Sequence, residues 1–248
     1  MNLFNNFMMH KLPLLIAIGS IPLTQLTINA QEATNPPPKS FATAFEPPNG
    51  DKPLATSGGA SRGEQCIADV QNSKIPITPI LPAINQRLTV ASHPTFLIHI
   101  PETSAKQVFF KIEAQNQELS YQTTLPISGN AGIIKITLPS DAPSLAIGQN
   151  YQWALALICG DTLKPDSPIA NGSITRIQPE AELKQQLSSM TEIEQATFYI
   201  ESGIWYEAIM TIAQLKQEQP DNAKLVSIWQ EILGSVGLNN IAKAEFVE

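Results

Sequence analysis

Side chains from which catalytic and metal sites are built are scarce in this sequence. Its 248 residues contain two cysteines and three histidines, and only 6% are aromatic. Two cysteines exclude a disulfide-dense small scaffold and a zinc site made of cysteine alone. The zinc signatures HExxH and CxxC do not occur either. We therefore expect no metal ion, no cofactor and no enzymatic activity.

Positive charge is also in short supply. Lys and Arg number 15 against 22 Asp and Glu, which leaves a formal charge of -7. Proteins that bind nucleic acid carry a basic surface against phosphate, so we expect no nucleic-acid partner. The chain is nevertheless 43% apolar and only 15% charged, a composition that supports a folded core.

The first 30 residues predict an export signal. They contain one charged side chain, Lys11, which precedes an apolar run from Leu12 to Leu23. A short positive region followed by such a run is typical of a secretory signal peptide. An uncleaved anchor is the alternative, but a proline-interrupted run falls short of the roughly 20 apolar residues that span a bilayer. We expect an exported, periplasmic or extracellular protein without a membrane span after cleavage.

A segment rich in proline and glycine follows the predicted signal peptide. Residues 31–63 hold six prolines and four glycines. Proline removes a backbone donor and glycine loosens the chain, so this composition predicts a disordered tether. Beyond it, periodicity and charge divide the chain into a segment at 64–178 and another at 179–248.

Residues 64–178 show the period of β-strands. Apolar side chains occupy every second position from Val108 to Ala114 and from Tyr151 to Cys159. Shorter stretches around Phe96 and Ile134 behave in the same way. Several such strands, separated by turn residues, predict an all-β sandwich.

A local motif refines the predicted type of sandwich. The sequence Leu145-Ala-Ile-Gly148-Gln-Asn-Tyr151 resembles the tyrosine corner of immunoglobulin and fibronectin III-like sandwiches. In that corner a tyrosine hydroxyl bonds the backbone a few residues upstream. The residue before the glycine is Ile147 rather than the usual proline. We expect an immunoglobulin or fibronectin III-like sandwich.

Residues 179–248 change to helical periodicity and are acidic. They carry eleven acids and four bases, whereas residues 64–178 are near neutral. The small and aromatic residues from Ala196 to Pro220 are spaced as in one tetratricopeptide unit, and a further helix is expected over about 222–236. A repeat array needs about three units for a continuous core. This small all-α segment must therefore dock on the sandwich or on a partner.

Five motifs together resemble one known family over about residues 61–247. They are Pro94-Thr-Phe-Leu-Ile-His-Ile-Pro101, Tyr151-Gln-Trp-Ala-Leu-Ala-Leu-Ile-Cys159, Ile174-Thr-Arg-Ile-Gln-Pro179, Gly203-Ile-Trp-Tyr-Glu-Ala208 and Ser235-Val-Gly-Leu238. The chain resembles a cyanobacterial family of exported proteins known as domain-of-unknown-function family 928. The resemblance implies an exported address, and it implies no activity and no site.

The two cysteines predict one disulfide between Cys66 and Cys159. An exported chain with an even, low cysteine count normally pairs its thiols. Cys159 shares the face of Trp153, so we expect its sulfur to be buried. The alternative is two unpaired buried thiols. A catalytic thiol would need a nearby cation that lowers its pKa, and the sequence shows no local signature of one.

The remaining polar side chains are isolated in the sequence. His93 and His99 lie six residues apart, on a turn and a strand, and surface positions are favoured over a shared metal. His99 is expected to point away from the core face. Aspartates in turns usually cap their own backbone rather than bind calcium, and helical acids are expected to be solvated rather than to form an acid–base pair. These acids are Asp141, Asp161, Asp166, Glu192, Glu194 and Glu201.

Three aromatic residues of the helical segment allow two interpretations. Trp205, Tyr206 and Trp229 hold the helices together in the favoured one and stack on sugars in the other, with Tyr206 expected at the surface. We expect a non-enzymatic protein-interaction module of the cell envelope, which offers an acidic surface or a sheet edge to an envelope protein. A carbohydrate or cell-wall binding protein is the alternative. The sequence does not indicate an oligomeric state.

Overall fold

The computed structural model describes residues 62–82, 87–114, 120–179 and 181–247. The predicted signal peptide (1–30) and nearly all of the predicted tether (31–63) lie outside these residues. The described elements, in chain order, are α2 (Arg62–Asn72), β1 (Thr78–Pro79), β2 (Leu88–Thr89), β3 (Thr95–Ile100), β4 (Gln107–Ala114), β5 (Ser120–Pro126), β6 (Gly132–Thr137), β7 (Asn150–Ile158), β8 (Ile169–Arg176), α3 (Ala181–Ser189), α4 (Glu192–Glu201), α5 (Trp205–Glu218) and α6 (Ala223–Ser235).

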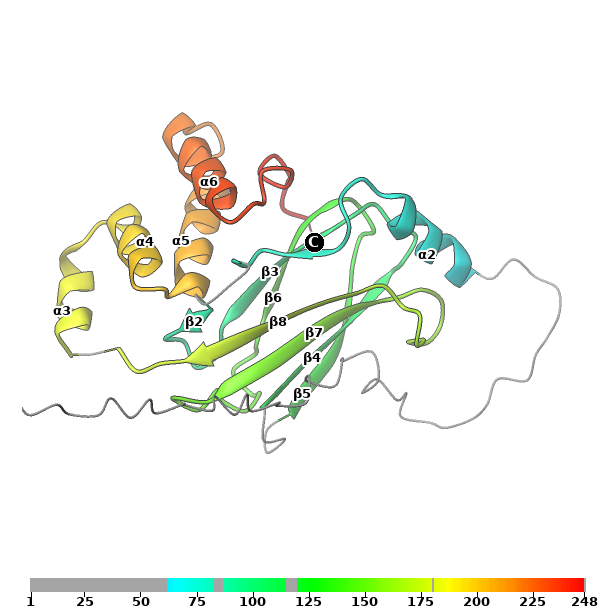
Figure 1. Ribbon diagram of the computed structural model, residues 1–248, viewed down its shortest axis with the longest axis horizontal. Coiled ribbons are helices and arrows are strands. Elements are labelled where there is room, and N and C mark those ends of the chain that lie inside the picture. Colours follow the sequence, from blue (N-terminus) through cyan, green and yellow to red (C-terminus); the bar gives the residue numbers. More distant parts are fainter. Residues whose placement is uncertain (1–61, 83–86, 115–119, 180, 248) are drawn as a thin grey trace, which may run out of the picture. The chain divides into compact units, whose positions relative to one another are not determined.

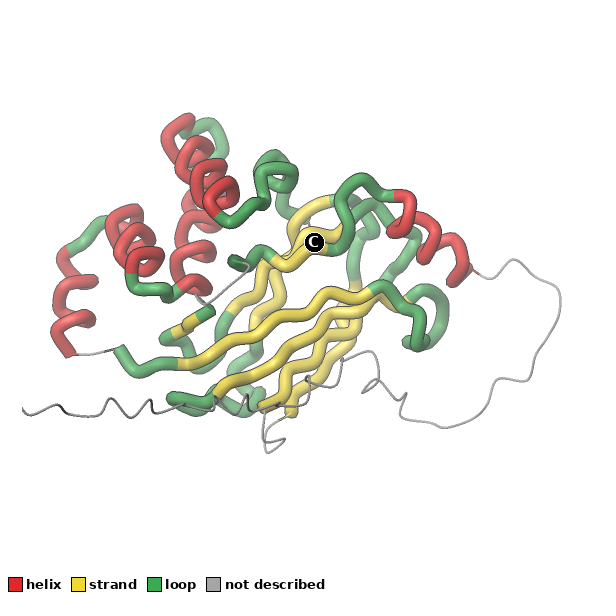
Figure 2. Tube along the Cα trace, viewed as in Figure 1, coloured by secondary structure: helices red, strands yellow, loops and turns green. Residues whose placement is uncertain are grey.

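The described strands form two sheets that face each other (Figure 1). One sheet has the order β1-β3-β6 and the other the order β2-β8-β7-β4-β5. Neighbouring strands are antiparallel except β2 and β8, which are parallel. The sandwich-like β fold followed by helices confirms the coarse prediction (Figure 2).

The inner faces of the two sheets carry the apolar side chains that the alternation predicted. The ring of Phe96 on β3 lies 5.0 Å from that of Phe110 on β4 and 5.3 Å from that of Trp153 on β7. All three side chains are buried. At the start of β7 the hydroxyl of Tyr151 accepts a hydrogen bond from the backbone N–H of Ala146 at 2.8 Å, which is the bond that the tyrosine-corner motif predicted.

Helix α2 differs from the prediction of strand periodicity over residues 64–178. The stretch Arg62–Asn72 is helical. Its apolar residues Cys66, Ile67 and Val70 are spaced for one face of a helix rather than for alternation, and they pack on the core. The strand period begins only after this helix.

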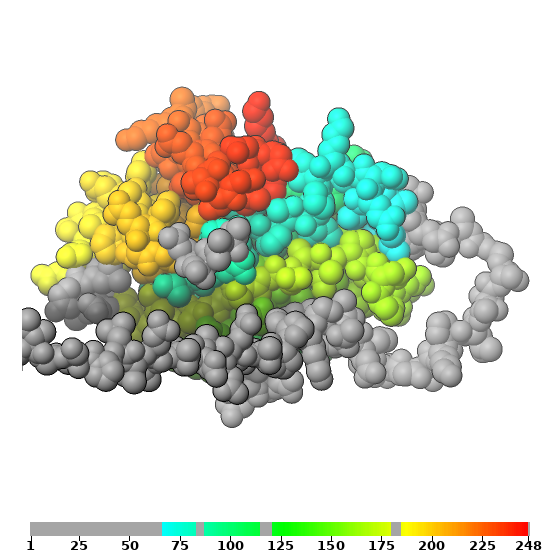
Figure 3. Space-filling model, viewed as in Figure 1, coloured from blue at the N-terminus to red at the C-terminus, as the bar shows by residue number. Residues whose placement is uncertain are grey.

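The C-terminal helices pack on the sandwich of the same chain. Capping residues define two of them, since Thr191 and Glu194 form a capping box at α4 and Asn222 caps α6. Glycine at 203, with φ of +71°, turns the chain from α4 into α5. In the space-filling view the C-terminal segment, yellow to red, lies against the cyan part of the chain (Figure 3).

The last described residues return to the three-stranded sheet. The N–H of Ile133 on β6 donates to the carbonyl of Glu245 at 2.7 Å, and the N–H of Val247 donates to the carbonyl of Ile133 at 3.0 Å. Gly132 permits this approach, because a Cβ there would lie 2.6 Å from the Glu245 carbonyl. None of the helices in the described ranges is long and apolar enough to cross a membrane.

Candidate functional site

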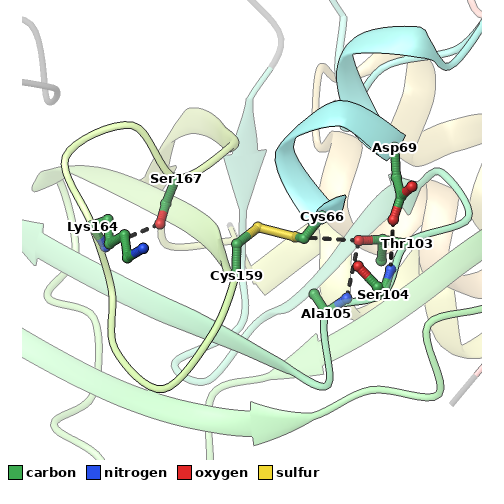
Figure 4. Close-up of a disulfide and its surroundings, with 8 residues drawn as sticks. All are labelled: Cys66, Asp69, Thr103, Ser104, Ala105, Cys159, Lys164 and Ser167. Carbon is green, nitrogen blue, oxygen red and sulfur yellow. Dashed lines mark hydrogen bonds between the residues drawn. A yellow bond between two sulfur atoms is a disulfide. The ribbon is translucent and has the colours of Figure 1, made fainter. Parts of the chain in front are cut away.

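One end of the sandwich is braced by the predicted disulfide. Cys66 of α2 and Cys159, which follows β7, are joined with a Cα–Cα distance of 5.4 Å, and both residues are buried. The hydroxyl of Thr103 donates to the Cys66 sulfur at 3.4 Å. Figure 4 shows the helix and the β3–β4 loop held together around this bond. The disulfide therefore ties α2 to the end of β7, and hydrogen bonds tie it to the β3–β4 loop.

A polar hollow of about 680 Å³ lies beside this disulfide-braced helix. The Asp69 carboxylate accepts from the N–H of Ser104 at 3.0 Å, and the N–H of Thr103 donates to the Gly129 carbonyl at 2.9 Å. These bonds hold α2 and two loops in one arrangement. The lining residues, rich in hydroxyls and amides, are Asp69, Asn72, Ser73, Glu102, Thr103, Ser104, Lys106, Ser128, Gly129 and Asn130.

The two histidines occupy separate structural positions. The His93 ring lies 3.0 Å from both the Ser92 hydroxyl and the Ala142 carbonyl. His99, expected at the surface, is instead buried, and its Nδ1 lies 3.4 Å from the Pro76 carbonyl. The surface prediction was wrong because the loop before β1 lies against the His99 ring at Pro76. Burial also lowers the pKa of His99, which favours a neutral ring.

The six acidic residues singled out in the sequence are exposed. The Glu194 carboxylate accepts from the backbone N–H and the hydroxyl of Thr191, and these bonds lower its pKa. Glu194 therefore has a defined capping function. No group of three or more metal-ligating side chains occurs in the described residues.

The aromatic residues of the helical segment lie inside the fold. Trp205, Tyr206 and Trp229 are all buried, and Tyr206 is only 3% exposed, so the prediction that Tyr206 lies at the surface was wrong. Its hydroxyl accepts from Trp153 Nε1 at 2.9 Å and donates to the Ser173 carbonyl at 3.0 Å. Burial raises its pKa well above the ordinary value. Adjacent positions on α5 can both be buried because the sandwich contacts the first turn of this helix.

A buried carboxylate at the same contact was not foreseen from the sequence. Glu207 Oε1 accepts from the Thr89 hydroxyl at 2.6 Å and from the N–H groups of Val90 and Ala91, both at 3.0 Å. Its Oε2 is buried and has no hydrogen-bond partner among the described residues. Burial raises the pKa of Glu207, although the hydrogen bonds oppose the shift. Burial, with a further contribution from the charge of Glu207, raises the pKa of Tyr199 on α4.

Glu207 and its aromatic neighbours form a structural contact between α5 and the sandwich. Trp205 Nε1 adds a hydrogen bond to the Ile80 carbonyl at 2.8 Å. The Trp205 and Tyr206 side chains and the Oε1 atom of Glu207 therefore all bond within the fold. The solvent-facing features that remain are the acidic helices and the polar hollow.

Comparison with known proteins identifies one family. The family model described as Domain of Unknown Function (DUF928) matches residues 57–246. No curated protein matches the chain.

Proposed function

Because the chain belongs to the DUF928 family, whose description names no activity, we propose a function from its structure: an exported, non-enzymatic interaction module of the cell envelope. Its acidic helical surface binds an envelope protein. The observation that supports this proposal is the excess of exposed acidic over basic side chains on the helical segment. The disulfide also supports an oxidising, extracytoplasmic compartment.

Seven carboxylates of the helical segment are exposed, on α4, at the end of α5, between α5 and α6, on α6 and in the tail. Few cations offset them, and Lys216 is half-buried with its ammonium 5.7 Å from the Phe246 ring centroid. A surface of one charge sign steers a partner of the opposite sign and makes association sensitive to salt. The expected partner therefore presents a basic surface.

The finer description of the fold belongs to the same proposal. We take the sandwich as immunoglobulin-like, because the order β8-β7-β4-β5 matches G-F-C-C′ and Tyr151 stands at the start of the strand in position F. We take α4 and α5 as one tetratricopeptide-like unit, because buried Ala196 and Ala208 allow close packing of this helix pair. Both parts are scaffolds that commonly carry interaction surfaces.

The test compares matched charge variants in a crosslinking pull-down from envelope extract. One variant combines Glu201→Gln, Glu218→Gln and Glu231→Gln on the helices. Its control combines Asp141→Asn, Asp161→Asn and Asp166→Asn on the sandwich. All six side chains are exposed, so both variants should fold. A truncation at Gln178 would not serve, because it removes Trp205 and Tyr206 from the core.

The expected result is a specific protein that the wild type and the sandwich variant capture and the helical variant loses. Capture should weaken as salt increases, because exposed charges are screened within roughly 10 Å at 0.1 M salt. Equal capture by the two variants would contradict an acidic binding surface.

The polar hollow supports a second candidate, binding of an envelope polysaccharide. Its hydroxyl, amide and carboxylate groups can bond the hydroxyls of a sugar. Trp205, Tyr206 and Trp229 are buried and cannot stack on one. Titration calorimetry with polysaccharide fragments tests this candidate, with Asn72→Ala and Asn130→Ala combined as the site variant. Binding that is unchanged in this variant would exclude the hollow.

A further inference from the structure

The edges of the two sheets are protected unequally. Strands β1 and β2 have two residues each, and β1 ends in a proline. The edge of β6 bonds the C-terminal tail through Ile133. Short strands, proline and covering segments are devices that block pairing with another chain. Strand β5, at the end of the five-stranded sheet (Figure 1), has seven residues and pairs only with β4 among the described strands.

The register of the β4–β5 pair shows which backbone groups of β5 face outward. The N–H of Ile127 donates to the carbonyl of Lys106 at 3.0 Å, in line with the antiparallel register Gln107↔Pro126. Bonded and non-bonded positions alternate along an antiparallel pair. Tyr121, Thr123 and Leu125 therefore bond to β4. Gln122 and Thr124 direct their N–H and C=O groups away from it.

The side chains of β5 add no protection to this edge. The strand Ser-Tyr-Gln-Thr-Thr-Leu-Pro contains no charged residue, and its proline is the last residue. Gln122 and Thr124 are exposed, while Tyr121 and Leu125 are half-buried against the core. Natural edge strands usually carry a charge or an interior proline where pairing must be avoided.

We propose that β5 is a self-association edge, on which β5 of a second copy of the chain pairs in antiparallel orientation about a two-fold axis. Thr123 lies opposite its own copy at this axis. In this register Gln122 of one copy faces Thr124 of the other, so their outward N–H and C=O groups exchange hydrogen bonds. The two five-stranded sheets then form one continuous sheet across the dimer.

The sequence of β5 is self-complementary in this register. This favours a second copy of the chain as the partner that pairs with the β5 edge. Tyr121 of one chain lies opposite Leu125 of the other on the inward face, an aromatic–aliphatic cross-strand pair. Ser120 lies opposite Pro126, where the proline carbonyl can still accept a bond. No charged side chains meet, although each chain carries a net charge of -7.

Proline substitution tests the edge without breaking the sheet. Thr124→Pro removes an outward N–H and leaves the bonds to β4 in place, because proline is tolerated where the N–H faces solvent. Thr124→Val keeps the N–H and is the matched control. Molar mass is measured over a concentration series by light scattering. We expect wild type and Thr124→Val to dimerise with increasing concentration and Thr124→Pro to remain monomeric.

A cysteine crosslink tests the register independently of the proline. Residues opposite each other in a non-bonded antiparallel pair have Cα atoms about 4.5 Å apart, within disulfide range. Thr123→Cys should therefore form a covalent dimer under mild oxidation, and Ser144→Cys, exposed in another loop, should not. A wild-type chain that stays monomeric at every concentration, or equal crosslinking of both variants, would overturn the proposal. The first result would leave the edge to a strand from another protein.

Discussion

The buried carboxylate of Glu207 allows a sharp test of how α5 is attached to the sandwich. Glu207→Ala removes the acceptor for the Thr89 hydroxyl and for the N–H groups of Val90 and Ala91. Thr89 is fully buried, so its hydroxyl loses its partner without access to bulk water. Leaving buried donors unpaired costs about 1–3 kcal/mol each. The Ala91 N–H keeps a second acceptor, the Thr89 hydroxyl oxygen at 3.0 Å, and partial exposure reduces the sum further. We therefore expect a loss of about 3 kcal/mol in the free energy of unfolding at neutral pH.

Glu207→Gln separates the hydrogen bonds from the charge. The amide oxygen can replace Oε1, and the substitution removes a charge whose burial is unfavourable. We expect the free energy of unfolding to change by less than about 1 kcal/mol. Urea denaturation followed by tryptophan fluorescence measures both variants. If Glu207→Gln proves as destabilising as Glu207→Ala, the charge itself holds the contact and the reasoning fails.

The pH dependence gives a second measure with a defined sign. Burial raises the pKa of Glu207 in the folded state, so the folded chain binds this proton more readily than the unfolded chain. Its contribution to stability is complete below the unfolded pKa of about 4.5 and is lost as pH rises through the folded pKa. Wild type should therefore gain stability relative to Glu207→Gln when pH falls from 7 toward 4. A difference that does not change with pH would refute the shift.

Three further predictions concern other parts of the fold. Cys66→Ser should lower the free energy of unfolding by about 4 kcal/mol, since the disulfide closes a loop of 93 residues; reduced wild type should match it in urea denaturation. Tyr151→Phe should cost about 1 kcal/mol, because the Ala146 N–H loses its acceptor, and an unchanged midpoint would contradict a stabilising corner. Gly132→Ala should displace the tail, because its Cβ would lie 2.6 Å from the Glu245 carbonyl; faster amide exchange at Val247 would show this.

The sequence predicted strands correctly where apolar side chains alternate clearly and are buried in the core. The residues around Phe96, Val108, Ile134 and Tyr151 form strands β3, β4, β6 and β7. Strand β5 was not foreseen, because its threonines and glutamine give no apolar alternation. Its conformation follows from pairing with β4 along seven residues. Local pattern predicts strands that contribute to a core, whereas a polar edge strand is defined by its neighbour.

The burial of single residues at the helix–sandwich contact could not be predicted from the sequence. Trp205 and Tyr206 are adjacent on α5, and we predicted an inward position for Trp205 and a surface position for Tyr206. The sandwich covers the first turn of the helix and buries the second ring as well. The same contact buries Glu207, which the sequence shows only as one acid among eleven. His99 is buried for a similar reason, by a loop distant in sequence.

The sequence by itself determined the coarse architecture, the family, the pairing of Cys66 with Cys159 and the hydrogen bond of Tyr151. These features depend on local alternation, on a short motif and on there being only two cysteines to pair. Only the tertiary structure decided that the helices dock on their own sandwich and that a carboxylate is buried there. It also decided that strand β5 pairs with no described strand other than β4. Such features depend on contacts between segments far apart in the chain, and no local pattern of residues records which segments will meet.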